Sequence, residues 1–127
     1  MNLEDDRRYT ESYLWLRERG DKVEMGIVES AADTADRFFL FEMPGEGEKV
    51  EKGEPLVEYE AMKRVGDLES PIDGEVVEVN REVEEDPGMI IEDPWNSWLV
   101  RVEPPGGFDF MDLMGAEEAG EYYEEQV

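Results

Sequence analysis

The sequence predicts a mainly β fold with short helices and a carboxy-terminal helix. The pattern of residues along the chain predicts the fold class, and the chain length predicts the number of domains. Short segments rich in β-branched and aromatic residues recur between Gly, Pro and Asp residues, which is typical of strands joined by turns. The chain has 127 residues, the size of one ordinary domain. We therefore expect a single domain over residues 1–127, with a core over about residues 9–103 and a helical extension over residues 108–127.

The elements follow in order along the chain. The strands are expected at residues 13–16, 23–28, 38–43, 56–60, 76–79 and 98–102, with a short one around Val50. Residues 29–36 (ESAADTAD) predict a short helix capped from Ser30. After the Pro104–Gly107 break, apolar residues at positions 108, 111 and 113 or 114 have helical spacing. This stripe indicates core packing by a carboxy-terminal helix.

Composition excludes several kinds of site. The chain has no Cys and no His, which removes thiol nucleophiles, imidazole bases and zinc sites built on those ligands. It also lacks the calcium-loop motif, so we expect no metal site. No apolar run approaches the roughly 20 residues of a membrane span, and the amino terminus has no apolar signal core, so we expect a cytoplasmic protein.

The charge constrains the partners. The chain carries 36 acidic and 12 basic residues, a formal net charge of -24. Nucleic acids and anionic membranes would be repelled, whereas a protein partner should present basic residues. Because the acids are spread over the whole chain, adaptation to a salty cytoplasm (a halophilic protein) is favoured over a docking surface for one basic partner. Molar salt would screen the self-repulsion, with a Debye length of ~3 Å.

One lysine stands out. Lys63, one of four lysines, lies in EAMKRV between two predicted strands, with Gly and Pro fixing the turns on both sides. This arrangement predicts an amine presented outward at the tip of a hairpin. An enzyme that modifies one lysine needs such a defined shape around it, although an ordinary surface lysine is the usual explanation for any single lysine.

The run from Glu60 to Asn80, EAMKRVGDLESPIDGEVVEVN, resembles the biotinyl/lipoyl attachment domains and, more closely, the glycine cleavage H-protein family. The family's run reads approximately E-S-V-K-A-x-S-D-x-x-S-P-x-x-G-E-V-x-x-V-N. Matches continue outward through Tyr9–Thr10, Trp15, Gly47 and Gly53, so the resemblance covers about residues 9–102.

The resemblance implies a lipoyl-domain-like barrel-sandwich hybrid with lipoic acid amide-linked to Lys63. The protein would be a carrier and not an enzyme, and the arm would supply the thiol chemistry that the chain lacks. Implied partners are a lipoate ligase or lipoyl transferase and loading and unloading enzymes, including a dihydrolipoamide dehydrogenase. Glu60 matches an acidic residue that helps to orient the ligase, and Gly74 matches a turn position that needs no side chain.

Departures from the family pattern leave the pathway open. In this family a polar cleft shelters a charged aminomethyl group. Tyr13 and Leu14 replace a His-Glu pair of the family pattern, and Thr34 replaces a histidine. Of the polar residues, Ser12 and Asp67 are kept. Leu14 cannot hydrogen-bond or neutralise an ammonium. These changes slightly favour an H-like lipoate-binding protein of heterodisulfide-reductase-like sulfur oxidation. The alternatives are the glycine cleavage carrier itself, a biotin carrier, suggested by the Ala61-Met62-Lys63 triplet, and a binding domain that carries nothing.

Overall fold

The computed structural model describes residues 3–126, and their fold is mainly β, as predicted. The strands are β1 (Arg8–Tyr9), β2 (Leu14–Arg19), β3 (Lys22–Ile27), β4 (Phe38–Glu42), β5 (Lys49–Val50), β6 (Pro55–Ala61), β7 (Val65–Glu69), β8 (Gly74–Val79) and β9 (Val100–Glu103). The helices are α1 (Glu29–Ala35), α2 (Arg81–Glu85), α3 (Met89–Glu92), a 3-10 turn η1 (Phe110–Asp112) and α4 (Ala116–Glu125). Of the helices in this described range, none is long and apolar enough to cross a membrane.

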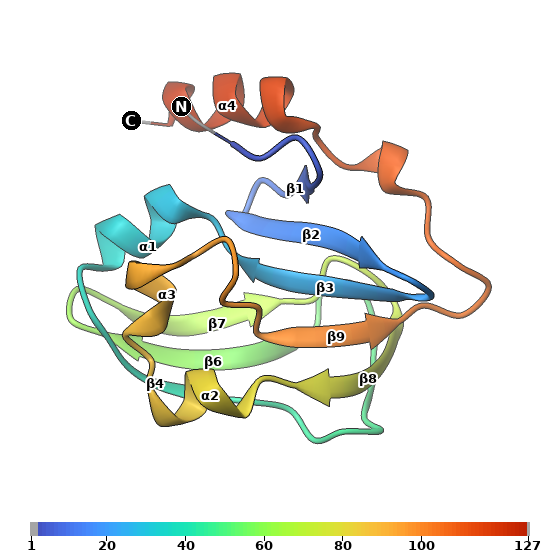
Figure 1. The fold of residues 1–127 in the computed structure, drawn as a ribbon, viewed down its shortest axis with the longest axis horizontal. Coiled ribbons are helices and arrows are strands. Elements are labelled where there is room, and N and C mark those ends of the chain that lie inside the picture. The colour runs from blue at the N-terminus through green and yellow to red at the C-terminus, as the bar shows by residue number, and fades with distance from the viewer. Residues whose placement is uncertain (1–2, 127) are drawn as a thin grey trace.

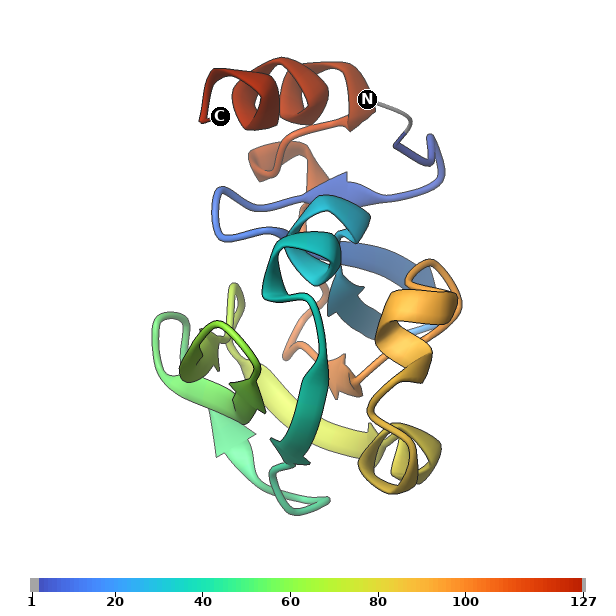
Figure 2. The same cartoon turned by 90° about the vertical axis from the view of Figure 1, so that its left-hand side faces the viewer.

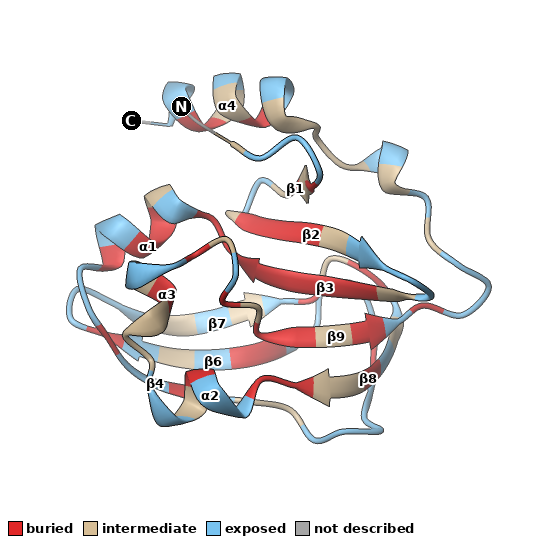
Figure 3. Cartoon of the chain, in the orientation of Figure 1, coloured by how far each residue is buried: buried red, intermediate tan, exposed pale blue. Residues whose placement is uncertain are grey.

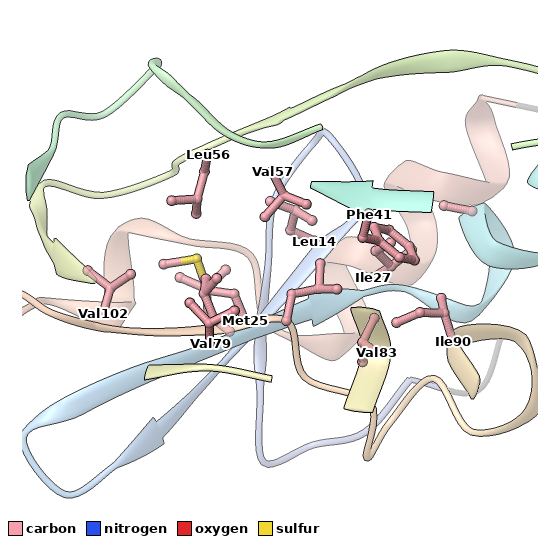
Figure 4. Packing of buried hydrophobic residues seen from close by; sticks show 14 of the residues in the cluster. Leu14, Met25, Ile27, Phe41, Leu56, Val57, Val79, Val83, Ile90 and Val102 are labelled. Carbon is pink, nitrogen blue, oxygen red and sulfur yellow. The ribbon is translucent and has the colours of Figure 1, made fainter. Parts of the chain in front are cut away.

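The strands form two antiparallel sheets that face each other (Figure 1). One sheet has the order β1-β2-β3-β9-β8-β5, and the other has the order β4-β6-β7. Figure 4 shows the main core between them, where side chains such as Met25, Phe41 and Val57 meet. Burial of this apolar surface is the main force that holds the two sheets together.

A second, smaller core lies on the far side of β2, under α4 (Figure 3). Its centre is Trp15, which is fully buried and donates a hydrogen bond from Nε1 to the Pro94 carbonyl oxygen at 3.1 Å. The Trp15 ring lies over Gly26 on β3, where a Cβ atom would come within 2.3 Å of it. Tyr123 of α4 joins this core and donates its hydroxyl hydrogen to the Thr10 carbonyl oxygen. Helix α4 is thereby fixed to the amino-terminal strands.

Every predicted strand is present, but the sequence-based prediction missed some elements. Strands β1 and β7 and helices α2 and α3 were not predicted. The apolar stripe after residue 107 does not form one helix: a 3-10 turn comes first, and α4 begins only at Ala116. The predicted last residue, 127, lies outside the described range, as do residues 1 and 2. Ser30 is not the cap of α1 either, since it lies inside the helix and its Oγ has no partner among the described residues.

The outer face of the larger sheet carries a buried carboxylate. Glu24 on β3 is fully buried and is held by Arg17, at 2.5 Å, and by Arg101, at 2.9 Å. Arg101 also pairs with Glu78 at 2.9 Å and lies over the Trp98 ring. Removal of one member of a buried ion pair leaves uncompensated charge in a poorly solvated site.

We expect Glu24→Ala to lower the free energy of unfolding by about 3–5 kcal/mol, because two arginines would lose their shared partner. Chemical denaturation of the purified variant measures this. The matched control is Glu75→Ala on the exposed side of β8, which should change the unfolding free energy by less than about 1 kcal/mol. Equal effects of the two substitutions would contradict a stabilising role for the buried carboxylate.

The outer face of the smaller sheet is different, because its acids face one another. Glu42, Glu58 and Asp67 lie directly opposite one another on β4, β6 and β7 and are all exposed; we call them the acidic ladder. A hydrogen bond with the Glu42 side chain, followed by the charge of Glu42, raises the pKa of Glu58. Like charges directly opposite in a sheet are destabilising.

We expect Glu58→Gln to raise the midpoint of thermal unfolding at neutral pH and low salt. The folded protein holds the Glu58 proton up to a higher pH than the unfolded chain does, so stability falls as pH rises through that window. The gain should therefore vanish below the ordinary glutamate pKa and shrink in molar salt. Thermal melts across pH measure it, with Glu121→Gln on α4 as control. A gain that persisted undiminished at acid pH would contradict this explanation.

Candidate functional site

Lys63 lies at the tip of a hairpin, as the sequence predicts, but the strand that follows it is β7 and not the predicted strand at residues 76–79. Strand β6 ends at Ala61 and β7 begins at Val65, so the turn consists of Met62, Lys63 and Arg64. The turn is at the same end of the molecule as α1 (Figures 1 and 2). The Lys63 side chain is exposed, and no hydrogen bond or ion pair joins its amine to another residue of the described chain. The amine is therefore free to react.

Hydrogen bonds on both sides of Lys63 hold the turn in place. The Ala61 N–H donates to the Arg64 carbonyl oxygen at 2.8 Å, which closes the loop. The Met62 N–H donates to the carbonyl oxygen of Arg37, between α1 and β4, also at 2.8 Å. The Arg64 guanidinium donates from Nη2 to the Ala31 carbonyl oxygen of α1 at 3.1 Å. The backbone at Lys63 is thus fixed to α1 and β4 while its side chain projects.

A cleft of about 290 Å³ lies beside the turn, and we call it the hairpin cleft. Its walls are mostly aromatic or aliphatic, with a polar group at several points. The lining residues are Ser12, Tyr13, Ile27, Ala31, Phe38, Tyr59, Arg64, Asp67, Leu68 and Glu69. A larger hollow of about 750 Å³ shares Ser12 and Glu69 but extends toward residues 104–114, away from the turn. Arg64, the residue that follows Lys63, lines the smaller cleft and not the larger hollow, so of these two it is the hairpin cleft that adjoins the turn.

One wall of the cleft is held in an unusual backbone conformation. Tyr13 has φ of 69°, a region that is uncommon for residues other than glycine and that persists only where its surroundings impose it. Its ring stacks on Tyr123 of α4, with the ring centres 4.5 Å apart, and its carbonyl oxygen accepts the Val28 N–H at 2.9 Å. The carboxy-terminal helix therefore helps to shape the cleft.

The structure brings some of the predicted site residues together. Ser12 and Asp67 both line the hairpin cleft, and the Ser12 hydroxyl lies 2.9 Å from the Thr10 hydroxyl. Glu60 is exposed on β6, on the outer face just before the turn. Two of the three thus line the cleft beside the turn and the third precedes the turn on β6, and their functional roles stay predictions.

Gly74 is not part of this group. It begins β8, pairs with Val50 and follows the end of β7 that lies away from the turn. The sequence suggested a turn that needs no side chain. In the structure the constraint is close packing instead, since a Cβ at Gly74 would lie 2.4 Å from Val102 Cγ1 and 2.8 Å from the Glu103 carbonyl oxygen.

The structure also explains two of the departures from the family pattern. Leu14 is almost fully buried, is part of the main core and does not line the hairpin cleft (Figure 4). Thr34 donates its hydroxyl hydrogen to the Ala31 carbonyl oxygen at 3.0 Å. Sequence reasoning missed Tyr59 and the bridging role of Arg64. The only signal for Arg64 was a basic residue next to Lys63, and nothing in the sequence indicated its contact with α1.

Comparison with known proteins extends over nearly the whole chain. Residues 7–126 match the family model described as glycine cleavage H-protein. A glycine cleavage system H protein of Halalkalibacterium halodurans is 35% identical over 126 residues, which cover 98% of each chain. One from Thermus thermophilus is 35% identical over 128 residues and the full length of both chains.

A solved structure agrees. The crystal structure of a glycine cleavage system H protein from Mycobacterium marinum superposes with a TM-score of 0.83, at 32% identity and over 98% of each chain. Fold, length and sequence point to the same relatives, whose lipoyl-domain-like architecture this chain shares. The chain therefore belongs to the glycine cleavage H-protein family, whose members are carriers with lipoate on a lysine and are not enzymes themselves.

Proposed function

We propose that Lys63 is the lysine that carries the lipoyl group. The observation that supports this most is a solvent-exposed amine, without a side-chain partner, on a turn that hydrogen bonds fix on both sides. The other lysines lack this setting: Lys22 pairs with Glu78, Lys49 lies in β5, and Lys52 follows β5, away from the hairpin tip. A bound lipoyl group supplies the thiol–disulfide chemistry that a chain without cysteine lacks.

The residues of the hairpin cleft fit such an arm. Tyr13, Phe38, Tyr59 and Leu68 give the cleft an apolar wall, and a dithiolane with its hydrocarbon chain loses water favourably against such a surface. Ser12 and Asp67 offer a hydroxyl and a carboxylate to a polar group at the end of the arm. In this proposal the protein holds and shields the arm between visits to enzymes. The partners are a lipoate ligase or lipoyl transferase, the loading enzymes and a dihydrolipoamide dehydrogenase.

For the pathway, we propose glycine cleavage, because the curated relatives named above match over the whole length of the chain. An arm that bears an aminomethyl group carries positive charge, and the acidic residues Asp67 and Glu69 are among those that line the cleft.

Heterodisulfide-reductase-like sulfur oxidation is the second candidate, and a specific feature favours it. Position 14 contributes no polar group to the cleft, since Leu14 lies in the core. The Thr34 hydroxyl donates to the Ala31 carbonyl oxygen within α1. The guanidinium of Arg64 lines the cleft and disfavours a second cation there.

The attachment site is tested by the intact mass of the protein purified from its native host, followed by peptide mapping. We expect one lipoyl increment on the peptide that contains Lys63, and none on the Lys63→Arg protein expressed in the same host. Lys52→Arg is the matched control and should keep the increment. A biotin increment would move the protein to carboxylase chemistry, and an unmodified Lys63 in cells that lipoylate other carriers would refute the carrier proposal.

The pathway is tested by asking whether glycine decarboxylase loads the aminomethyl group onto the lipoyl protein. We expect incorporation of the radiolabelled α-carbon of glycine into the arm, with the carboxyl carbon leaving as CO2, at a rate within about tenfold of an ordinary H protein, which corresponds to about 1.4 kcal/mol in barrier height. The Lys63→Arg protein gives the background. A rate at background for a fully lipoylated protein would contradict glycine cleavage and favour the sulfur-oxidation pathway.

A further inference from the structure

Four of the five exposed large hydrophobic side chains in the described residues surround Lys63. Phe39 and Leu40 of β4, and Met62 and Val65 of the hairpin, have exposures of 52%, 39%, 53% and 74%; we call them the hairpin patch. The fifth, Met111, lies in the 3-10 turn η1, far along the chain. Clustering of exposed apolar side chains marks an interaction site in a soluble domain.

The register of the smaller sheet makes this patch continuous. Leu40 is opposite Glu60, and Glu60 is opposite Val65, so the two apolar side chains lie on one outer row across β4, β6 and β7. Met62 is tied to the segment that precedes Phe39, because its N–H donates to the Arg37 carbonyl oxygen. The patch therefore spans β4 as well as the turn.

The next row of the same face is the acidic ladder. No lysine or arginine in the described part of the chain forms an ion pair with Glu42, Glu58 or Asp67, or with Glu60 beside the patch. On the larger sheet, by contrast, Arg17 and Arg101 compensate the buried Glu24. A surface that combines uncovered apolar side chains with uncompensated like charge is complementary to a protein with an apolar centre and a basic rim.

The position of the patch identifies the kind of partner. A lipoyl arm carries its dithiolane many bonds away from the lysine, so an enzyme that acts on the dithiolane need not touch side chains at the base of the arm. An enzyme that forms the amide bond must bring its active site to Nζ and so must cover Met62 and Val65, on either side of Lys63. In that step the uncharged amine attacks the carbonyl carbon of lipoyl adenylate, and a C–N bond forms. The bond between this carbonyl carbon and the phosphate oxygen breaks. AMP leaves, and the nitrogen loses a proton to solvent.

We propose that the lysine-acylating enzyme docks on the outer face of β4-β6-β7, with an apolar anchor on the hairpin patch and basic residues on the acidic ladder. This inference rests on the proposed attachment of lipoate to Lys63. It adds β4, which lies 21 or more residues before Lys63 in the sequence, to the surface that the enzyme recognises.

The apolar half of the surface is tested by kinetics of lipoylation, with a purified lipoate ligase, lipoate and ATP acting on the unmodified full-length protein. We expect Leu40→Ser and Val65→Ser each to lower kcat/KM by about tenfold, mainly through KM, because each removes exposed contact area without touching Lys63. Met111→Ser is the matched control, as exposed as Val65, and should leave kcat/KM unchanged. Equal rates for all three variants would overturn the docking proposal.

The charged half is tested with the Glu42→Gln/Glu58→Gln double variant. Its kcat/KM should fall and should depend less steeply on salt than that of the wild type, because attraction to a basic rim accelerates association at low salt. The same variant should be more stable than the wild type, so misfolding cannot explain a slower reaction. The control is Glu118→Gln/Glu121→Gln on α4, with the same change in net charge. If both double variants lower kcat/KM equally, the enzyme responds only to total charge, and the proposal that it recognises the acidic ladder is overturned.

Two further outcomes separate this inference from the carrier proposal. If the wild-type protein is not acylated at Lys63, the carrier proposal fails and the docking proposal fails with it. If the wild type and all variants are acylated equally at Lys63, the carrier proposal stands and the docking proposal alone fails. Acetylation of Lys63 by a small reagent needs no docking and should be equal in every variant. A parallel loss in that reaction would assign the effect to the lysine itself and overturn docking.

Discussion

The hydrogen bonds that fix the hairpin turn are the interactions on which the site depends. A lysine at the tip of a long, free loop would spread its amine over a large volume, and any enzyme that acts on it would first have to order that loop. Here the Met62 N–H is bonded to the connection before β4, and the Arg64 side chain is bonded to α1. The same contacts bring α1 beside the hairpin, and α1 supplies Ala31 to the cleft. The contacts that fix the turn therefore also position a wall of the cleft.

Strand β6 links this turn to the core through the alternation of its side chains. Val57 and Ala61 point inward and are buried, whereas Glu58 and Glu60 point outward. A change of register by one residue would turn the apolar set to solvent and bury the carboxylates, so the core pins the register. Because the register is fixed, the acids and the exposed apolar residues of the outer face also have fixed positions relative to Lys63. The core of this protein thus determines what its partners meet.

How much of this could be read from the sequence depends on whether the signal is local. Runs of β-branched and aromatic residues indicate most of the strands, and turn residues on both sides indicate that Lys63 lies in a turn, so both could be predicted. Strand β7, with the sequence VGDLE, has a glycine and two acids in five residues and is a strand because it pairs with β6. The apolar stripe at positions 108–114 has helical spacing, but the segment forms only a 3-10 turn, in which Phe110 packs against the main core while Met111 stays exposed.

The site shows the same division. Ser12, Asp67 and Glu60 were identified by matching a family pattern and do lie around the turn, but no pattern indicated that Arg64 would bridge to α1 across the cleft. The explanation for Gly74 was also local, a turn, whereas the real constraint is the approach of β9, which begins 26 residues later. Contacts between segments that are distant in sequence account for each of these differences.

The distribution of charge suits a protein that must visit several enzymes and leave each one. Six of the twelve basic residues form ion pairs within the part of the chain that the structure describes, so these six lower the internal repulsion without offering a basic surface. The outer face of β4-β6-β7 keeps its acids uncompensated. Long-range attraction of that kind raises the association rate more than it lengthens the lifetime of a complex. In the docking proposal, the hairpin patch adds apolar contacts beside Lys63, which give specificity to an encounter that charge accelerates.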